Sequence, residues 1–268
     1  MKRVSRPTLA DGTQVLDIDE NFGQLRRIGS GSFSHIYRCQ RKTTKQVGCL
    51  KVLQASKARD CIDEAKLLLR AQGHASVCSL LDVFYCADTH YPVLFLEVLE
   101  DLPLRMEAGE LCDLSGDISS ALAYIWRQQL VHNDVKPSNV LRRQPRPIYV
   151  LADFGCSFIF RTKHGAIDTV GDAHYLAEDR FQGQCPLDAH KIDIYALGLT
   201  LAEKSFGVGP AEWMSPDNFS PREAKNAVVQ RLVDLPLSLQ FLVDWTIKGC
   251  ADRPSAQQLE TWLVTRKE

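Results

Sequence analysis

The chain has 268 residues, of which 45% are hydrophobic and 24% are charged, and its formal net charge is -1. This is ordinary globular composition, and the length allows one large domain or two lobes with cores of their own. The balanced charge excludes a strongly basic field, so we expect no nucleic-acid partner. No run of about 18 apolar residues occurs, so we expect no membrane span.

The nine cysteines are scattered along the chain and form no Cys-x-x-Cys pair, which argues against a zinc site. They favour free thiols in a reducing compartment, so we expect an intracellular protein of the nucleus or cytoplasm. Residues 1–20 are polar, and no apolar core follows their basic start, so they predict a loose lead-in and no signal peptide.

Residues 25–39 alternate apolar and polar side chains on both sides of a small-residue turn, which predicts a hairpin. Gly29 and Gly31 would let backbone amides approach a phosphate, with Phe33 at the tip of the turn. A Gly-x-Gly turn is a weak signal by itself, and a hairpin that binds nothing is the alternative.

The next predicted strand, 47–53, carries Lys51 among apolar residues. A buried lysine needs a partner, so we interpret Lys51 as a phosphate contact held by a carboxylate; an edge-strand lysine facing solvent is the alternative. Residues 61–71 predict a helix with Glu64 on its apolar face. Glu64 is the predicted partner of Lys51, and Asp63 is its competitor.

Residues 80–85 and 92–99 predict two more strands, followed by a polar connector at 100–103. This connector is a natural hinge whose backbone could bind an adenine edge. Leu96 would lie at the back of that pocket, and Asp101 could reach a ribose hydroxyl.

A helix predicted over 113–129 leads into the polar loop 132–141. Asp134 could accept a proton from a hydroxyl, Lys136 could neutralise a phosphate, and Asn139 could complete a magnesium shell. These are the parts that phosphoryl transfer needs. A strand predicted over 148–152 then ends at Asp153-Phe154-Gly155, where a carboxylate on a turn could bind magnesium. Asp, Asn and Gly are also ordinary turn residues, which is the alternative for both segments.

Taken together and in order, these motifs resemble those of the eukaryotic protein kinases. The resemblance covers residues 22–266 and implies an α+β, two-lobed fold: a small β-rich N-lobe with one helix at about 21–98, and a larger α-helical C-lobe at about 102–266, with ATP between them. It implies Mg²⁺ and ATP as cofactors and a protein substrate. The motifs that carry it are Gly29-Ser30-Gly31, Lys51, Glu64, His132-x-Asp134-x-Lys136-x-x-Asn139 and Asp153-Phe154-Gly155.

The resemblance also implies a role for each site residue. Asp134 and Lys136 are the expected catalytic residues, and Asn139 and Asp153 are the expected magnesium ligands. Ser34 stands where a kinase loop has its third glycine. The expected nucleotide-binding residues are Ile28, Gly29, Ser30, Gly31, Ser32, Phe33, Ser34, Ile36, Lys51, Glu64, Glu97 and Leu99.

Three further segments resemble structural parts of the family. Residues 171–179 resemble the end of an activation segment, with Asp179 in the place of a usual glutamate. Residues 192–199 resemble the buried helix of the large lobe, in which Asp193 would bond to backbone of the catalytic loop. Arg253, near the start of the last helix, would pair with Asp179.

Asn133 replaces the arginine that usually binds a phosphate on the activation segment, so we expect activity without phosphorylation there, at Thr162 or Thr169. Asn133 and residues 171–177 look most like the Wee/Myt branch, whose members inhibit cyclin-dependent kinases by phosphorylating tyrosine or threonine. A Mos-like serine/threonine kinase and a pseudokinase scaffold are the alternatives, and a small-molecule phosphotransferase is a more distant one. We expect a monomer.

Overall fold

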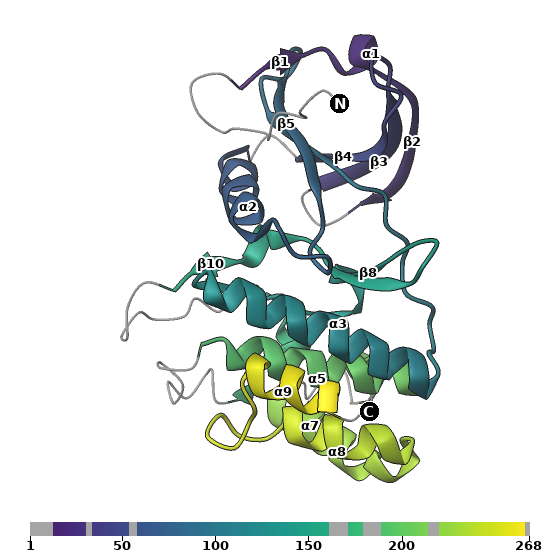
Figure 1. Cartoon of the computed structure of the whole chain (residues 1–268), viewed down its shortest axis with the longest axis vertical. Coiled ribbons are helices and arrows are strands. Elements are labelled where there is room, and N and C mark those ends of the chain that lie inside the picture. Colours follow the sequence, from purple (N-terminus) through teal and green to yellow (C-terminus); the bar gives the residue numbers. More distant parts are fainter. Residues whose placement is uncertain are drawn as a thin grey trace. The chain divides into compact units, whose positions relative to one another are not determined.

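The computed structural model describes residues 13–30, 34–53, 58–160, 171–178, 189–213 and 220–265 (Figure 1). The chain divides into two compact units. The first is made of residues 1–73, 78–99 and 153–155, and the second of residues 74–77, 100–152 and 156–268. The first unit is mainly a β-sheet and the second is mainly helical, so the predicted α+β class is confirmed.

A six-stranded sheet forms the first unit, in the order β1-β5-β6-β4-β3-β2. β1 runs parallel to β5, and the other neighbours are antiparallel. The predicted hairpin is present as β2 and β3. The strands are β1 (Val15–Leu16), β2 (Phe22–Ser30), β3 (Ser34–Arg41), β4 (Val47–Leu53), β5 (Leu80–Cys86) and β6 (Pro92–Leu96).

The described part of the predicted loose lead-in is ordered. β1 pairs with β5 at the edge of the sheet, where the backbone amide of Tyr85 donates to the carbonyl oxygen of Gln14 at 2.9 Å. Helix α1 (Ile18–Asn21) follows at once, capped by Asp17, which accepts from the amide of Glu20 at 2.7 Å. Local polarity cannot predict this strand pairing, because the partner strand lies about 70 residues further along the chain.

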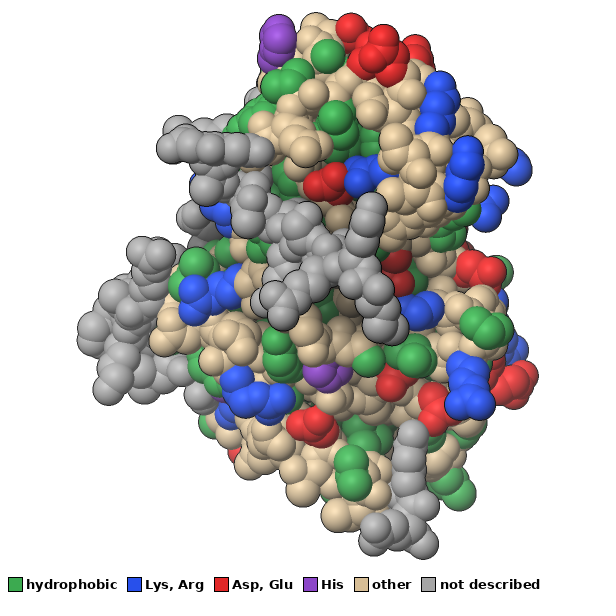
Figure 2. Space-filling view, turned by 45° about the horizontal axis from the view of Figure 1, so that its top comes forward, with side chains coloured by type: hydrophobic (Ala, Val, Ile, Leu, Met, Phe, Trp, Pro, Cys, Tyr) green, Lys and Arg blue, Asp and Glu red, His purple; other side chains and the backbone are tan. Residues whose placement is uncertain are grey.

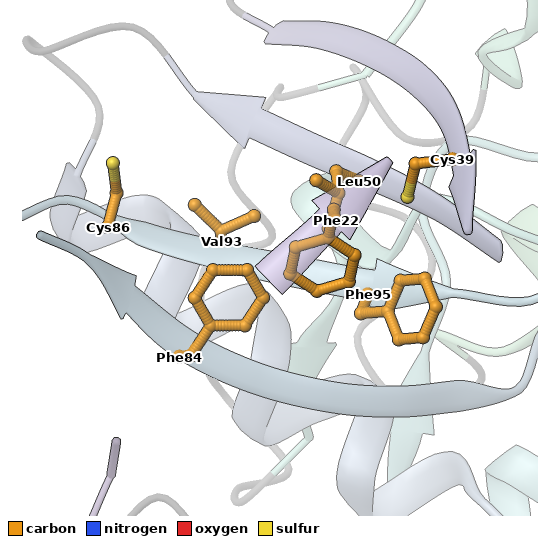
Figure 3. Close-up of a cluster of buried hydrophobic side chains, with 7 residues drawn as sticks. All are labelled: Phe22, Cys39, Leu50, Phe84, Cys86, Val93 and Phe95. Atoms are coloured by element: carbon orange, nitrogen blue, oxygen red, sulfur yellow. The ribbon is translucent and has the colours of Figure 1, made fainter. Parts of the chain in front are cut away.

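Aromatic side chains fill the core on one face of this sheet (Figure 3). Phe22 stacks on Phe84 with ring centroids 5.4 Å apart, and it meets Phe95 edge-on at 5.2 Å. The guanidinium of Arg41 lies 4.9 Å from the centroid of the Phe95 ring. Such aromatic and cation–π pairs add about 0.5–1.5 kcal/mol each beyond the area that they bury. Leu50 of β4 points into the same core.

Helix α2 (Ala58–Ala71) packs against β5 and β6 and starts three residues before the predicted Cys61. It ends close to Gly73, whose φ of +113° is a left-handed conformation that glycine adopts without strain. The strand predicted over 92–99 is shorter than expected, because β6 ends at Leu96 and residues 97–99 continue outside the ladder.

The second unit is mainly helical, and its most completely buried helix is α5 (Lys191–Phe206), which packs against α3 and α8. Helix α3, labelled in Figure 1, packs against α5, α8 and α9. Two short antiparallel strand pairs, β7–β10 and β8–β9, belong to the same unit. The elements are α3 (Ala108–Arg127), β7 (Leu130–Val131), η2 (Pro137–Asn139), β8 (Val140–Arg143), β9 (Ile148–Leu151), η3 (Phe154–Cys156, partly in the first unit), β10 (Phe158–Ile159), η4 (Ala173–Tyr175), α5 (Lys191–Phe206), α6 (Pro210–Trp213), α7 (Pro221–Gln230), η6 (Leu232–Asp234), α8 (Leu237–Thr246) and α9 (Ala256–Thr265).

Helix α3 begins five residues before the predicted Asp113. Glu110 accounts for the earlier start, because its carboxylate accepts a hydrogen bond from the backbone amide of Glu107 at 3.1 Å and so caps the helix. Leu111, Leu114 and Ile118 then extend one buried stripe at helical spacing.

Helix α5 is buried on nearly every side, as the resemblance implied. Gly198 is the point of closest approach to α8, because a Cβ atom there would clash with the Oγ1 of Thr246 and lie 2.9 Å from Cγ2 of Ile247. The hydroxyl of Thr246 donates to the carbonyl oxygen of Leu242 at 3.0 Å, so it has little freedom to move away. The helix ends at Gly207, with φ +74°.

Seven described cysteines are free thiols, and burial raises the pKa of Cys39 to about 11 and that of Cys61 to about 12. These thiols therefore act as small apolar side chains. Cys250 is disulfide-bonded, so the prediction of free thiols is wrong for this cysteine.

Within the described ranges, no helix is both long enough and apolar enough to span a bilayer. Side chains of both charge signs occur on the face drawn in Figure 2.

We predict that Gly198→Ala lowers the free energy of unfolding by about 1–3 kcal/mol, because the added methyl group overpacks the contact between α5 and α8. The matched control is Gly116→Ala in α3, where a Cβ atom would meet nothing within 4 Å. This control should gain up to about 1 kcal/mol through helix propensity. Urea unfolding of both variants measures the difference, and equal stability of the two would contradict the prediction.

Candidate active site

Lys51 of β4 is held between two carboxylates in the first unit. Its Nζ atom lies 2.8 and 2.9 Å from the two oxygens of Glu64 and 2.9 Å from Oδ1 of Asp153. Lys51 is 7% exposed and Glu64 is 4% exposed. The predicted pairing of Lys51 with Glu64 is thus confirmed, while Asp63 instead pairs with the exposed Lys66.

Burial and charge act in opposite directions on this cluster. Burial lowers the pKa of Lys51, but the nearby charges of Glu64 and Asp153 outweigh it and raise that pKa overall. Burial raises the pKa of Glu64, and Lys51 opposes this effect. The short contacts from Nζ to both Glu64 oxygens select the ion-paired form, so Lys51 is a fixed cation near neutral pH.

The strand register aligns the predicted nucleotide-binding residues with Lys51. Gly29 pairs with Ile36, and Ile36 pairs with Lys51, so the three lie directly opposite one another on β2, β3 and β4. Ile28 and Ser30 flank Gly29 on β2, and Ser34 is buried at the start of β3. Gly31, Ser32 and Phe33 lie outside the described residues.

Glu97 and Leu99 follow β6 and precede the predicted hinge at 100–103. The carboxylate of Glu97 accepts from the backbone amide of Ser79 at 2.7 Å, and its own amide donates to the carbonyl oxygen of Ser79 at 3.1 Å. The side chain of Glu97 therefore binds the start of β5, and a contact from this segment to a ligand would come from backbone groups.

In the second unit, a carboxylate on α5 shapes the loop that carries Asp134. The two oxygens of Asp193 accept from the backbone amides of His132 at 2.8 Å and Asn133 at 2.7 Å. Asp193 is 3% exposed, as expected for a buried structural carboxylate. Asn133 has φ +71°, a conformation in which asparagine is enriched, and its side-chain amide donates to the carbonyl oxygen of Cys156 at 3.0 Å.

Asp134 is oriented through both of its oxygens. The side-chain amide of Asn139 donates to Oδ2 at 2.8 Å and also to the backbone oxygen of Asp134 at 2.8 Å. Oδ1 accepts from the backbone amide of Asp172 at 3.0 Å, and Nζ of Lys136 lies 3.1 Å from Oδ2. The structure thus brings together the three polar residues of the predicted loop.

Asp172 belongs to this cluster and was not predicted as a site residue. Its Oδ2 lies 3.5 Å from Nζ of Lys136. Burial lowers the pKa of Lys136, but Asp134 and Asp172 outweigh that effect and raise it. The only sequence signal was its place after Gly171 in the segment compared with the Wee/Myt branch, and local sequence could not reveal a contact to a loop 38 residues away.

The residues predicted to bind magnesium have suitable chemistry. Because the side-chain nitrogen of Asn139 donates twice to Asp134, its carbonyl oxygen is turned the other way. The carboxylate of Asp153 is 47% exposed at the edge of the Lys51 cluster. Oxygen donors of this kind fit Mg²⁺. The part of the chain that the structure describes has no cluster of three or more His, Cys, Asp or Glu side chains able to hold a metal.

One predicted structural pair cannot be located, because Asp179 lies outside the described residues. Its predicted partner, Arg253, is 2% exposed and donates to the backbone oxygens of Lys191 at 3.0 Å and Lys248 at 2.8 Å. Its guanidinium also lies 4.9 Å from the centroid of the Tyr195 ring.

Comparison with known proteins identifies the family. Residues 22–261 match the model of the protein kinase domain. The chain is 32% identical over 196 residues to ribosomal protein S6 kinase alpha-2 of Homo sapiens, which covers 68% of the chain and 26% of that protein. It is 25% identical over 193 residues to the probable serine/threonine-protein kinase glkA of Dictyostelium discoideum, covering 68% of the chain and 39% of the relative.

A third relative, the putative ribosomal protein S6 kinase alpha-1 of Caenorhabditis elegans, is 25% identical over 242 residues, which is 85% of the chain and 29% of the relative. The chain therefore spans from 26% to 39% of the length of these relatives. Protein kinase domains use ATP and Mg²⁺. The match extends over most of the sequence, and the chain belongs to the protein kinase domain family.

Proposed function

We propose that this chain is an active protein kinase that transfers the γ-phosphate of ATP to a protein hydroxyl. The observation that carries the proposal is the buried ion pair of Lys51 and Glu64, with Asp153 bonded to the same ammonium. Burying this much charge costs free energy and adds little net stability. The cluster is therefore better explained by a ligand that needs a fixed cation.

In this proposal Asp134 orients the acceptor hydroxyl and takes its proton. The two hydrogen bonds from Asn139 and from the backbone of Asp172 hold the carboxylate plane, so little reorganisation is needed when the proton moves. Lys136 is kept protonated beside it and stabilises negative charge on the transferred group.

The remaining residues bind the nucleotide and the metal. Lys51, held by Glu64, binds the α- and β-phosphates, and Asn139 and Asp153 each supply an oxygen ligand to Mg²⁺. The metal neutralises phosphate charge when it is bound. Ile28 and Ile36 provide apolar contacts, and the turn from Gly29 to Ser34 covers the phosphates. The backbone of the connector at 100–103 binds the adenine edge, and Glu97 and Leu99 complete the nucleotide-binding set.

The substrate class is a finer proposal. We keep the Wee/Myt-like assignment, in which the acceptor is a tyrosine or threonine of a cyclin-dependent kinase, because Asn133 and residues 171–177 follow that pattern. The relatives named above are described as serine/threonine or ribosomal protein S6 kinases, which favours a serine/threonine acceptor instead. We further propose a monomer that works in the nucleus or cytoplasm.

Lys51→Met should lower the rate of phosphate transfer at least about 100-fold, because the phosphates lose their fixed cation. The variant leaves Glu64 buried without its partner, so its melting temperature should fall as well. The double variant Lys51→Met/Glu64→Gln removes that orphaned charge and should regain stability while staying inactive. Radiolabelled phosphate transfer and thermal unfolding provide the two readouts. Lys66→Met, at an exposed position of α2, is the control and should keep full activity. Transfer at the normal rate by a folded Lys51→Met variant would discard the assignment.

Asp134→Asn should lower transfer by about 100-fold or more, since an amide cannot accept the proton of the acceptor. ATP affinity should change little, because the proposed nucleotide contacts of the first unit are untouched. Fluorescence titration with an ATP analogue and a transfer assay separate the two effects. The control is Asp234→Asn, whose side chain is 61% exposed. An inactive wild-type chain that binds ATP would identify a pseudokinase scaffold.

Thr162→Ala and Thr169→Ala should both retain transfer activity. Asn133 is a neutral amide bonded to the carbonyl oxygen of Cys156, so it cannot bind a phosphate as an arginine does. Initial rates of the two variants, compared at equal melting temperature, measure the effect. Loss of activity in either folded variant would mean that a phosphorylated segment is required.

Incubation with a cyclin-dependent kinase, ATP and Mg²⁺ tests the branch. The Wee/Myt assignment predicts phosphate on a tyrosine or threonine of the glycine-rich loop of that kinase, which mass spectrometry locates. The Asp134→Asn variant is the matched control. Phosphorylation of a generic serine/threonine peptide, with none on the cyclin-dependent kinase, would reject this branch and leave the kinase activity standing.

A further inference from the structure

The segment that starts at Gly171 is fitted directly onto the catalytic loop of the second unit. Gly171 has φ +121°, and a Cβ atom there would lie 2.5 Å from the carbonyl oxygen of Asn133. Only glycine allows both this conformation and this approach. The chain therefore delivers the next residue, Asp172, to the immediate neighbourhood of Asp134, where its backbone amide donates to Oδ1 at 3.0 Å.

The two carboxylate oxygens of Asp172 do different things. Oδ1 caps the short helix η4 by accepting from the backbone amide of His174 at 3.1 Å, and it also lies 2.8 Å from Nδ1 of the same histidine. Oδ2 faces Lys136, 3.5 Å from Nζ. The side chains of Asp172 and Lys136 are 30% and 22% exposed, so their interaction is only partly screened by water.

We infer that Asp172 is a positioning residue, whose negative charge holds the ammonium of Lys136 beside Asp134 during phosphate transfer. The inference rests on the proposed kinase function and assigns a role to a side chain outside the predicted site. Lysine is a flexible four-carbon chain, and a single carboxylate partner leaves its ammonium free to swing. A second carboxylate, 3.5 Å from Nζ, narrows the range of positions that the ammonium can take, which is what a reaction that depends on positioning requires.

The groups around Asp172 keep its carboxylate ionised and hold its segment in place. Burial raises the pKa of Asp172, but its bonds to His174 and the charge of Lys136 outweigh that effect and lower it, so it is anionic near neutral pH. Tyr175, at the end of η4, donates its hydroxyl to Glu203 of α5. This bond attaches the segment to α5, the helix that also carries Asp193. The segment around Asp172 is therefore bonded both to Asp134 of the catalytic loop and to α5.

Asp172→Asn separates the charge from the cap. Asparagine caps helices as well as aspartate does, so η4 should remain capped while the charge that faces Lys136 is lost. Asp172→Ala removes both. If the charge matters, both variants should lower kcat about fivefold, the effect expected for losing a partly exposed ion pair worth up to about 1 kcal/mol. KM for ATP should stay unchanged. If only the cap matters, Asp172→Asn should behave like the wild type, which would overturn the inference.

A double-mutant cycle with Lys136→Met tests whether Asp172 acts through Lys136. A positioning role predicts that Asp172→Asn lowers the residual rate of Lys136→Met by less than about twofold, since the group to be positioned is gone. A merely structural role predicts the same fivefold loss in both backgrounds, together with a lower melting temperature, and that result would overturn the inference. Rates are measured with radiolabelled ATP over long incubations.

Asp234→Asn serves as the control for loss of one surface charge and should leave kcat unchanged. A wild-type chain without transfer activity overturns the proposed function and this inference with it. An active wild-type chain whose Asp172→Asn variant keeps the full kcat overturns the inference alone.

Discussion

The second unit depends on one buried carboxylate. Asp193 projects from α5, and its two oxygens accept the backbone amides of His132 and Asn133. Hydrogen bonds to a charged acceptor contribute about 1.5–3 kcal/mol each, and the same two amides would be costly to bury without a partner. This anchoring fixes the left-handed turn at Asn133 and so determines where the side chain of Asp134 begins.

The rigidity of α5 explains why a carboxylate on it can act as a reference point. The helix is buried on nearly all sides, and Gly198 lets α8 approach its backbone closely. A packed interior of this kind resists small displacements. The hydroxyl bond from Tyr175 to Glu203 uses the same helix to hold the segment that carries Asp172. The loop that carries Asp134 and the segment that carries Asp172 are therefore both hydrogen-bonded to the same rigid helix, α5.

In the described part of each unit a lysine lies close to two carboxylates, and the two clusters differ in burial. The Lys51 side chain is 9% exposed and that of Lys136 is 22% exposed. In both clusters the net charge is negative, and in both the carboxylates raise the pKa of the lysine against the effect of burial. The clusters are Lys51 with Glu64 and Asp153, and Lys136 with Asp134 and Asp172. A lysine arranged in this way stays protonated and well placed, which suits the binding of phosphate groups.

The sequence by itself determined the family, the α+β class and most elements, because hydrophobic period and short polar motifs are local properties. It also indicated that Lys51 needs a carboxylate, since an isolated buried ammonium is too costly. Only the tertiary structure decided that β1 adds a parallel strand at the edge of the sheet and that Asp172 lies beside Lys136. Both depend on contacts between residues far apart in the chain. The pairing of β1 with β5 and the close approach of Gly171 to Asn133 create these contacts, and local sequence patterns do not contain them.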